Sequence, residues 1–501
     1  MTMFALLSVA DKTGLEALAG PLVAAGLDLL ASGGTAHYLQ QQGFTVTEVA
    51  DYTGSPEILG GRVKTLHPRI HGGILARLDQ RTELEQAGIS PIAVVVVNLY
   101  PFAQTIAQPE VTESEAIEQI DIGGVALIRA AAKNFTQVSV LTHPDQYPDF
   151  SQHLTQGLTE SYRRTLAQQA FAYTSSYDQT IAQWFAGEGR LPETLNLHLT
   201  RHQPLRYGEN PHQPATWYRQ EAVGFTTARI LQGKELSFNN LVDLEAARRL
   251  VARFAPLPCA VIIKHTNPCG VALGITLAAA YHRAYTADSV SAFGGIVGLS
   301  QPVDEATAQQ LVQTFLECVL APDFSPEALA ILQRKPQLRL LALPDLTTAP
   351  PLDFKAISGG LLVQATATQP DDPAMWQVVT QRRPTPDEWR GLSFAWEVVQ
   401  QVKSNAIVLT RDQQTLGIGV GQTNRVGSAQ LALAQAGSQA QGAVLASDGF
   451  FPFDDTVRLA ARHGVQALIQ PGGSKRDSDS IAACDELGLT MVMTGTRHFL
   501  H

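Results

Sequence analysis

Two hydrophobic patterns alternate along the first third of the chain. Continuous apolar runs occupy Phe4–Val9, Leu27–Ala31, Ala93–Val97 and Val138–Leu141. Runs of this kind are typical of strands buried on both faces of a parallel sheet. Between the runs, apolar residues recur at helical spacing, as in Leu15–Ala25. This alternation predicts a doubly wound α/β domain.

A long amphipathic helix is expected to follow these strands. Its apolar stripe recurs at spacings of three and four residues and consists of Tyr162, Leu166, Ala170, Tyr173, Tyr177, Ile181 and Trp184. Gly187 and Gly189, with Pro192 just beyond, predict where this helix ends. The polar stretch 187–203 that follows predicts a domain boundary, which gives domains at 1–198 and 199–501.

The remaining sequence predicts a second α/β region. A connector rich in Pro, Thr and Asp, predicted to be irregular, spans 333–375. Two α/β modules joined by this connector account for the pattern on either side. The predicted elements are helix Asp243–Phe254, strand Cys259–Ile263, helix Glu305–Leu320, strands Ala406–Thr410, Leu416–Gly421 and Gly442–Ala446, and a helix from about Asp455.

Composition narrows the class of protein. The chain has 501 residues, too many for one ordinary core, and its 45% apolar and 16% charged residues are typical of a soluble globular protein. The strongly apolar run Ile92–Val97 is far shorter than the roughly 20 residues needed to span a bilayer. The first residues do not resemble a signal peptide, so we expect a cytoplasmic protein without membrane contact.

Charge and cysteine spacing exclude further classes. A formal net charge of −10 without a basic tail disfavours a nucleic-acid partner, although small anionic substrates remain possible. The four cysteines are far apart and form no CxxC pair. We therefore expect neither disulfides nor a structural zinc ion.

One candidate phosphate site lies near the amino end. Ser32-Gly33-Gly34-Thr35 stands between a predicted strand and a predicted helix, where backbone amides and the helix dipole suit a phosphate. Ser8 and Lys12 follow the first strand and are expected at the same sheet edge. A simple tight turn is an equally good interpretation of the glycine pair.

Three further segments of the first domain carry candidate chemistry. The loop Gly60–Gly73 holds Arg62, Lys64 and Thr65 between glycine pairs, which favours an anion-binding loop over a merely solvated one. Tyr100 follows the strand at Ala93–Val97. Asp121, Gly124 and Lys133 bracket a helical run, where a plain N-cap role for Asp121 is the simpler interpretation.

In the second domain, the strongest signal is Lys264-His265 at the end of a buried strand. One of the two side chains is expected to point into the core, which is a poor choice for stability and favours catalysis. A histidine can move a proton near neutral pH, and a lysine cation can stabilise an oxyanion.

Other polar loops of the second domain are weaker candidates. Arg206-Tyr207 opens a kinked aromatic loop, and Asn405 precedes a predicted strand. Arg425 follows a glycine-rich strand and is a candidate phosphate clamp, because its planar fork matches phosphate oxygens. Phe450 belongs to a loop with two further phenylalanines, which are either core residues or a stacking surface for a heterocycle.

Taken in order, these motifs resemble one family, the bifunctional purine biosynthesis proteins that join phosphoribosylaminoimidazolecarboxamide formyltransferase to inosine monophosphate (IMP) cyclohydrolase. The resemblance runs from Ser8 to His501 and is thinnest over 333–375. Leu500 departs from the paired terminal histidines of relatives. The motifs that carry it are Gly61–Pro68, Asn98–Phe102, Asp121–Gly124, Arg206–Gln213, Lys264–Gly270 and Gly449–Phe453.

The resemblance implies the fold and the activities. Domain 1–198 would have the methylglyoxal synthase fold and act as the cyclohydrolase. Domain 199–501 would consist of two cytidine-deaminase-like modules without zinc and act as the formyltransferase. The substrates would be 5-aminoimidazole-4-carboxamide ribonucleotide (AICAR) and 10-formyltetrahydrofolate, giving the formylated intermediate FAICAR and then IMP. A cytoplasmic homodimer is implied, with potassium as a monovalent cation.

The resemblance also implies residue roles. The catalytic set for formyl transfer is Lys264, His265 and Asn405, and for cyclisation it is Lys64, Tyr100, Asp121 and Lys133, with Asp121 and Lys133 as an ion pair. The implied substrate-binding residues are Ser8, Lys12, Ser32, Gly34, Thr35, Arg62, Thr65, Gly124, Arg206, Tyr207, Gly294, Arg425, Phe450 and Arg497.

Three rival functions remain at this point. The first domain alone could act as a methylglyoxal-synthase-type lyase or an allosteric sensor, with no need for Tyr100. The second domain could be a zinc deaminase, which bound zinc would reveal. A non-catalytic nucleotide-binding protein would bind ligand without turnover.

Overall fold

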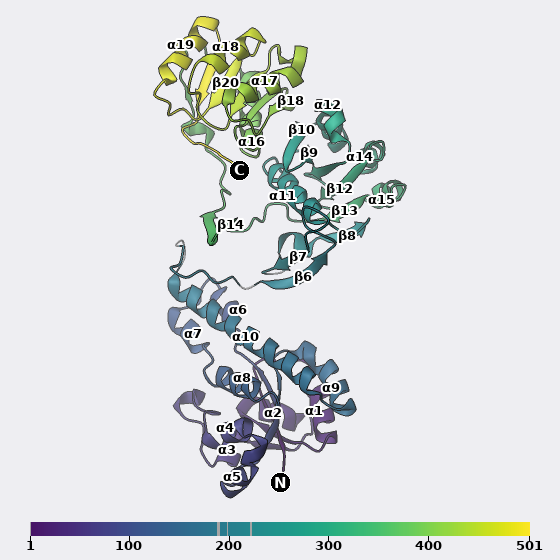
Figure 1. Cartoon of the computed structure of the whole chain (residues 1–501), viewed down its shortest axis with the longest axis vertical. Coiled ribbons are helices and arrows are strands. Elements are labelled where there is room, and N and C mark those ends of the chain that lie inside the picture. Colours follow the sequence, from purple (N-terminus) through teal and green to yellow (C-terminus); the bar gives the residue numbers. More distant parts are fainter. Residues whose placement is uncertain (1, 188–190, 198, 221–222) are drawn as a thin grey trace. The chain divides into compact units, whose positions relative to one another are not determined.

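A computed structural model describes residues 2–187, 191–197, 199–220 and 223–501. The chain divides into two compact units, Met1–His198 and Leu199–His501, each with its own buried apolar core (Figure 1). Gly189, one of the glycines expected to end the long helix, lies outside the described residues. Within the described ranges, no helix has both the length and the hydropathy needed to cross a membrane.

Unit 1 is organised around a sheet of five parallel strands in the order β3-β2-β1-β4-β5. The chain passes outward from β1 to β2 and β3, then returns to β4 beside β1 and continues to β5. The predicted doubly wound topology is therefore confirmed. The strands are β1 (Phe4–Val9), β2 (Asp28–Ala31), β3 (Val46–Glu48), β4 (Ile92–Asn98) and β5 (Ser139–Leu141).

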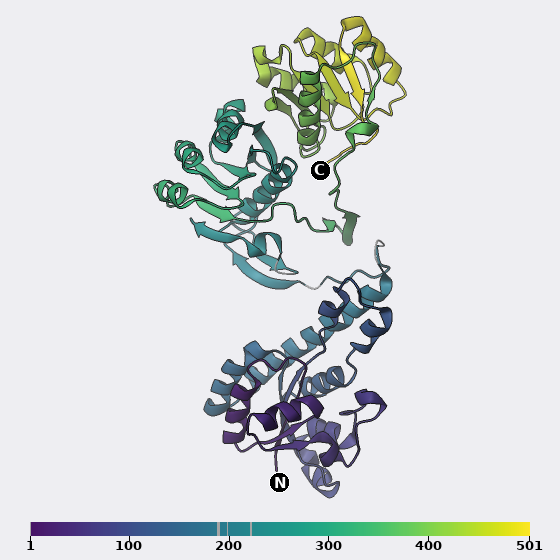
Figure 2. The same ribbon diagram turned by 180° about the vertical axis from the view of Figure 1, so that it is seen from behind.

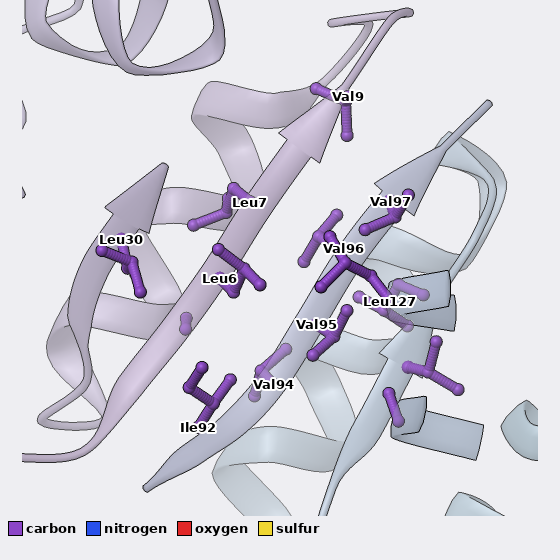
Figure 3. Packing of buried hydrophobic residues seen from close by; sticks show 14 of the residues in the cluster. Leu6, Leu7, Val9, Leu30, Ile92, Val94, Val95, Val96, Val97 and Leu127 are labelled. Atoms are coloured by element: carbon purple, nitrogen blue, oxygen red, sulfur yellow. The ribbon is translucent and has the colours of Figure 1, made fainter. Parts of the chain in front are cut away.

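The continuous apolar runs explain this sheet, because helices cover both of its faces (Figures 1 and 2). Leu6 and Leu7 of β1 and Val95 and Val96 of β4 are fully buried, and Leu127 packs beside them (Figure 3). Each such side chain contributes roughly 1.5–3 kcal/mol when buried. The helices are α1 (Leu15–Ala24), α2 (Gly33–Gln41), α3 (Val49–Thr53), α4 (Pro68–Leu75), α5 (Arg81–Gln86), α6 (Phe102–Ile106), α7 (Glu113–Glu118), α8 (Gly123–Lys133), α9 (Tyr147–Gln156) and α10 (Glu160–Ala186).

The long helix α10 both covers the core and fixes two loops. It begins at the Thr159 cap and ends at Gly187, as the apolar stripe predicts. Its Tyr173 hydroxyl accepts a hydrogen bond from the Leu99 amide at 3.0 Å. Its Tyr177 hydroxyl accepts one from the Asp121 amide at 2.8 Å. Both loops contain residues that the sequence assigns to the first candidate site.

Unit 2 contains a sheet in which twelve strands of the described chain are joined, together with two small hairpin sheets. The strands are β6 (Thr200–Leu205), β7 (Ala215–Arg219), β8 (Arg229–Gln232), β9 (Cys259–Lys264), β10 (Asn267–Leu273), β11 (Gly295–Leu299), β12 (Leu316–Ala321), β13 (Arg339–Ala342), β14 (Leu352–Ile357), β15 (Gly360–Ala365), β16 (Gln377–Val378), β17 (Ile407–Arg411), β18 (Gln414–Gly419), β19 (Val444–Ser447), β20 (Ala467–Gln470) and β21 (Thr490–Met493).

The order of elements occurs twice in unit 2. A helix precedes an antiparallel hairpin, a second helix follows, and three parallel strands complete each half: α11, β9-β10, α12 and β11-β12-β13, then α16, β17-β18, α17 and β19-β20-β21. Strands β10 and β18 join the halves. The helices are α11 (Phe238–Ala252), α12 (Leu277–Ala287), α13 (Ser289–Ala292), α14 (Glu305–Leu311), α15 (Pro326–Leu332), α16 (Pro386–Val399), α17 (Arg425–Ala436), α18 (Asp455–Arg462) and α19 (Asp477–Leu487).

Two predicted elements of unit 2 are wrong. The helix expected over Glu305–Leu320 ends at Leu311, and Leu316–Ala321 is strand β12. Pairing with β11 and β13 in the core overrides the helical spacing of its apolar residues. The connector 333–375 is not wholly irregular either. Arg339–Ala342 is an internal strand between β12 and β8, and β14-β15 form a hairpin.

Helix α12 packs directly on the backbone of β10 at Gly270, where a β-carbon would meet the carbonyl oxygen of Ala284. We expect Gly270→Ala to lower the free energy of unfolding of unit 2 by roughly 2–3 kcal/mol, because the helix must move away from the strand. Gly360 has open space around it and is the matched control. Urea denaturation of the full chain measures both variants. Equal midpoints for Gly270→Ala and wild type would contradict this packing.

Candidate active sites

The first candidate site is a cavity of about 730 Å³ at the carboxyl ends of β1, β2 and β4 in unit 1. Strands β1 and β4 are neighbours whose connections run in opposite directions, and ligands of open α/β sheets bind at such a point. The cavity brings together most of the residues predicted for cyclisation: Ser8, Lys12, Ser32, Gly34, Thr35, Arg62, Lys64, Thr65, Tyr100, Asp121 and Gly124.

One end of this cavity is a cluster of hydroxyl groups beside the start of α2. Ser32 is the N-cap residue of α2, but its hydroxyl makes no capping bond and instead lies 2.9 Å from the hydroxyl of Ser8. Thr35 Oγ1 accepts from the Val9 amide at 3.1 Å. The first amides of α2, the helix dipole and these hydroxyls together suit a phosphate group.

The cationic loop divides its charges between the cavity and the surface. Lys64 is half-buried, and its Nζ lies 3.9 Å from a carboxylate oxygen of Glu57. Arg62 also lines the cavity, but its guanidinium forms an exposed ion pair with Glu118. Arg69 of the same loop donates to two backbone carbonyls outside the cavity, at Tyr52 and Gly88, and is therefore structural.

Asp121 is the half-buried carboxyl group of the first site. It stands one residue before the N-cap of α8, and its Oδ1 accepts from the Gly124 amide at 2.6 Å. Burial raises the pKa of Asp121, while the amides of Gly124 and Tyr100 and the charge of Lys64 oppose that rise. A β-carbon on Gly124 would lie 2.6 Å from Asp121 Oδ2, so this position needs glycine.

Lys133 does not join this cavity. It is the last residue of α8 and lines a separate hollow with Arg129, Phe135 and Arg164. No ion pair links Lys133 to Asp121 among the described residues, so that predicted pair is wrong for a single chain. Helix α8 has 11 residues, and Lys133 is at the end opposite to the loop that holds Asp121.

Asn98 is a part of the first site that sequence reasoning missed. Its Oδ1 accepts from the amides of Ala10 and Asp11 at 2.6 and 2.9 Å, and its Nδ2 donates to the Asp11 carbonyl at 2.8 Å. The side chain of Asn98 at the end of β4 thus fixes the loop after β1 that carries Lys12. A buried amide at the end of a wholly apolar strand was the available signal.

The second candidate site, in unit 2, contains the Lys264-His265 pair. Lys264 and Asn267 pair across β9 and β10, which leaves His265 and Thr266 as a two-residue turn with φ of 52° and 66°. This is the turn geometry that suits tight hairpins. Lys264 is half-buried and His265 exposed, so the expectation that one points into the core is wrong. Lys264 is the last residue of β9, and the turn carries His265 beyond the end of that strand.

Two other predicted residues lie near this turn. Lys264 Nζ donates to the carbonyl of Phe293, and a β-carbon on Gly294 would lie 3.7 Å from Lys264 Nζ. Asn405 belongs to a segment tied to the same hairpin, because the Lys403 amide donates to Asn267 Oδ1 at 3.1 Å. The Asn405 side chain itself donates to the Gln422 carbonyl at 2.8 Å.

Arg425 has a different environment from the one expected. Its guanidinium is buried and forms an ion pair with the fully buried Asp448, which neutralises the charge that a phosphate clamp needs. Asp448 also accepts from the Ser404 hydroxyl, beside Asn405. Arg425 stacks on Phe499 at 5.6 Å. In this structure Arg425 therefore anchors the carboxyl-terminal segment.

The other aromatic and cationic candidates occupy the surface of unit 2. Phe450 is partly exposed, whereas Phe451 of the same loop is fully buried in the core. Arg497 stacks on the ring of Phe499 at 4.3 Å. Arg206 lies over the ring of Tyr207 at 5.1 Å in the loop between β6 and β7.

A cavity of about 820 Å³ in unit 2 adjoins these loops. Lys264, His265 and Asn405 are not among its lining residues, but Thr266, which follows His265, is one, and so are Lys403 and the last residue, His501. The lining includes Leu205, Trp217, Tyr218, Phe238, Thr266, Lys403, Leu500 and His501. Among the described residues, no group of three or more His, Cys, Asp or Glu side chains is arranged to hold a metal ion.

The chain thus has two α/β units, one with a hydroxyl-lined cavity where the sheet connections diverge and one with a Lys-His turn, as expected of a two-domain α/β enzyme. Residues 14–126 match the family model of MGS-like domains, and 131–435 match that of the AICARFT/IMPCHase bienzyme. The chain belongs to the AICARFT/IMPCHase bienzyme family. It is a bifunctional AICAR formyltransferase and IMP cyclohydrolase, which catalyses the last two steps of purine biosynthesis.

Curated relatives match along the whole chain. The chain is 59% identical over 514 residues to the bifunctional purine biosynthesis protein PurH of a Cyanothece species, covering 100% of both chains. The PurH proteins of a Nostoc and a Synechocystis species are each 58% identical, again with 100% of both chains covered. Among solved structures, the crystal structure of ForH matches with 37% identity and a TM-score of 0.35, over 38% of this chain and 100% of that one.

The raised pKa of Asp121 predicts a pH dependence of stability. Because burial raises this pKa in the folded state, the folded chain binds more protons than the unfolded chain, and stability falls as pH rises from about 4. Asp121→Asn removes this penalty, so its stability relative to wild type should increase with pH and then level off. Urea denaturation between pH 4 and 8 measures the difference.

Asp79 provides a control in which the effect of pH on stability has the opposite sign, because its hydrogen bond with Arg77 lowers the pKa of Asp79. Asp79→Asn should therefore lose stability relative to wild type as pH rises. If the stability of Asp121→Asn relative to wild type instead decreases with increasing pH, the pKa of Asp121 is not raised in the folded chain.

Proposed function

We propose that unit 1 carries out the cyclisation and unit 2 the formyl transfer. This division is supported by the presence of different candidate catalytic groups in the two units. Unit 1 has a hydroxyl-rich cavity with Lys64 and the half-buried carboxyl of Asp121, and unit 2 has the Lys264-His265 turn. The match of 14–126 to MGS-like domains supports placing the cyclohydrolase in unit 1.

Cyclisation requires the carboxamide nitrogen of FAICAR to attack the formyl carbon, after which the resulting hydroxyl leaves as water. Both groups belong to one molecule, so positioning supplies much of the rate. The phosphate would occupy the hydroxyl cluster at α2. Lys64 and the amide of Thr65 would stabilise the developing oxyanion. Asp121, whose pKa is raised, would move protons together with Tyr100.

Formyl transfer joins the formyl carbon to the exocyclic amine of AICAR and breaks its bond to the folate nitrogen. The amine is a weak nucleophile, because its lone pair is delocalised into the imidazole ring. His265 would take the amine proton, and Lys264 would stabilise the oxyanion or protonate the leaving nitrogen. Asn405 would orient the substrate, while Arg206 and Tyr207 would hold the nucleotide.

The formyl donor in this proposal is 10-formyltetrahydrofolate. The large aromatic-lined cavity beside Thr266 supports a flat heterocyclic ligand in unit 2. We also propose potassium as a bound monovalent cation. The reaction needs no zinc, since neither step requires a metal-activated water.

The two halves of unit 2 would share the cytidine deaminase fold. Support comes from the repeated order of a helix, a hairpin, a second helix and three parallel strands. A glycine in the second strand of each hairpin allows the following helix to pack on the backbone in the same way, at Gly270 and at Gly417. Repeated packing at matching positions is expected of duplicated modules.

The active form would be a cytoplasmic homodimer. Lys133 is proposed as catalytic but lies in a hollow apart from Asp121 in one chain. A second copy of the chain would resolve this, because it could present its own Lys133 to the cavity of its partner. Sedimentation measurements of the purified enzyme test the dimer.

Two substitutions separate the proposed sites. Lys264→Ala should lower formyl transfer from 10-formyltetrahydrofolate to AICAR by roughly 10²- to 10⁴-fold but leave the cyclisation of FAICAR unchanged. Lys64→Ala should do the reverse, because it removes only the oxyanion donor of unit 1. Separate assays with AICAR and with FAICAR measure the two rates. If either folded variant loses both activities, the division between units is wrong.

A further inference from the structure

The turn that carries Lys264 and His265 is held by a carboxylate from another element. Asp243 lies in α11, which packs against β9 and β11. Its Oδ1 accepts a hydrogen bond from the Thr266 amide at 2.6 Å. The bond joins two elements that the chain separates by 23 residues, so it is a tertiary restraint on the turn.

The turn needs such a restraint. His265 and Thr266 have φ of 52° and 66°, in the left-handed region, which is sterically unfavourable for a residue with a β-carbon. Neither is glycine, so the conformation must be stabilised by its surroundings. A charge-assisted hydrogen bond from the Thr266 amide to the Asp243 carboxylate is strong enough to offset the steric cost of this conformation.

Hydrogen bonds to the His265 carbonyl also hold the turn, whereas none is made by the His265 ring among the described residues. The His265 carbonyl accepts from Thr266 Oγ1 at 2.6 Å and from Asn267 Nδ2 at 3.2 Å. Within the described residues, no hydrogen bond holds the His265 imidazole, which is exposed. The backbone is therefore fixed while the imidazole stays available for a substrate.

The environment of Asp243 fits a fixed acceptor. Burial raises the pKa of Asp243, and the amide of Thr266 and the charge of His265 oppose that rise. The thiol of Cys318 on β12 also interacts with Asp243, and burial raises the pKa of that thiol to about 12.

We infer that Asp243 is a positioning residue for formyl transfer: its carboxylate holds the His265-Thr266 turn in the left-handed conformation that presents the imidazole beside the Lys264 ammonium. The inference rests on the proposed role of His265. Asp243 acts through the turn and does not touch the reacting atoms, so its removal should affect turnover more than nucleotide binding.

The test compares three substitutions at this position in the full-length enzyme. Asp243→Ala removes the acceptor and should lower kcat for formyl transfer about 10- to 100-fold, with the KM for AICAR within about twofold. Asp243→Asn keeps an oxygen for the Thr266 amide and should restore kcat to within about fivefold of wild type. Asp243→Glu keeps the charge but cannot place its oxygen at the same distance, and should lower kcat at least fivefold.

Cyclisation of FAICAR by the same variants reports whether unit 1 is intact. Asp304→Ala is the matched control, because Asp304 accepts from the Thr307 amide at 2.8 Å in the same manner but caps α14. It should leave kcat for formyl transfer unchanged. If Asp243→Ala fails to fold, the opposed results expected for Asp243→Asn and Asp243→Glu still decide the question.

Three outcomes would overturn the inference: kcat unchanged in Asp243→Ala or Asp243→Glu, a kcat of Asp243→Asn as low as that of Asp243→Ala, or a loss expressed only in KM. A parallel His265→Ala variant tests the proposed function separately. Formyl transfer retained by His265→Ala would refute the role of His265, whereas its loss together with an active Asp243→Ala would refute only the role of Asp243.

Discussion

The cost of burying an unpaired charge determines where chemistry can occur in this protein. Both units have strands that are apolar on both faces, and a charged side chain within them would need a partner. Reactive groups therefore collect where the strands end. In unit 1 the carboxyl ends of three parallel strands share one edge, and in unit 2 Lys264 ends strand β9 and His265 begins the tight turn that follows.

The same constraint distinguishes candidate catalytic residues from residues that hold the fold in place. Arg425 looks reactive in the sequence, yet its charge is matched by Asp448 inside the core, where it anchors the chain end. Asp243 and Asn98 are less conspicuous, but each uses a side-chain oxygen to hold a backbone loop that carries candidate chemistry.

Much of the fold follows from local patterns. Uninterrupted apolar runs predict the strands of the first sheet, and the stripe over 162–184 predicts α10, since its contacts are local. The strand at Leu316–Ala321 could not be distinguished from a helix, because its partners β11 and β13 are chosen by tertiary packing. For the sites, motifs predict which residues carry chemistry. Spacing alone could not reveal that Lys133 lies apart from Asp121, or that Asp243 contacts the Lys264 hairpin.

The central claim is that the two reactions occupy different units, and hydrogen–deuterium exchange with each ligand tests it most directly. IMP, the cyclisation product, should slow exchange of the amides at 32–36 and 62–65 in unit 1 and leave the turn at 264–267 unaffected. The formyltransferase substrate AICAR should slow exchange at 264–267. Protection of 264–267 by IMP, with no change at 32–36, would contradict the account.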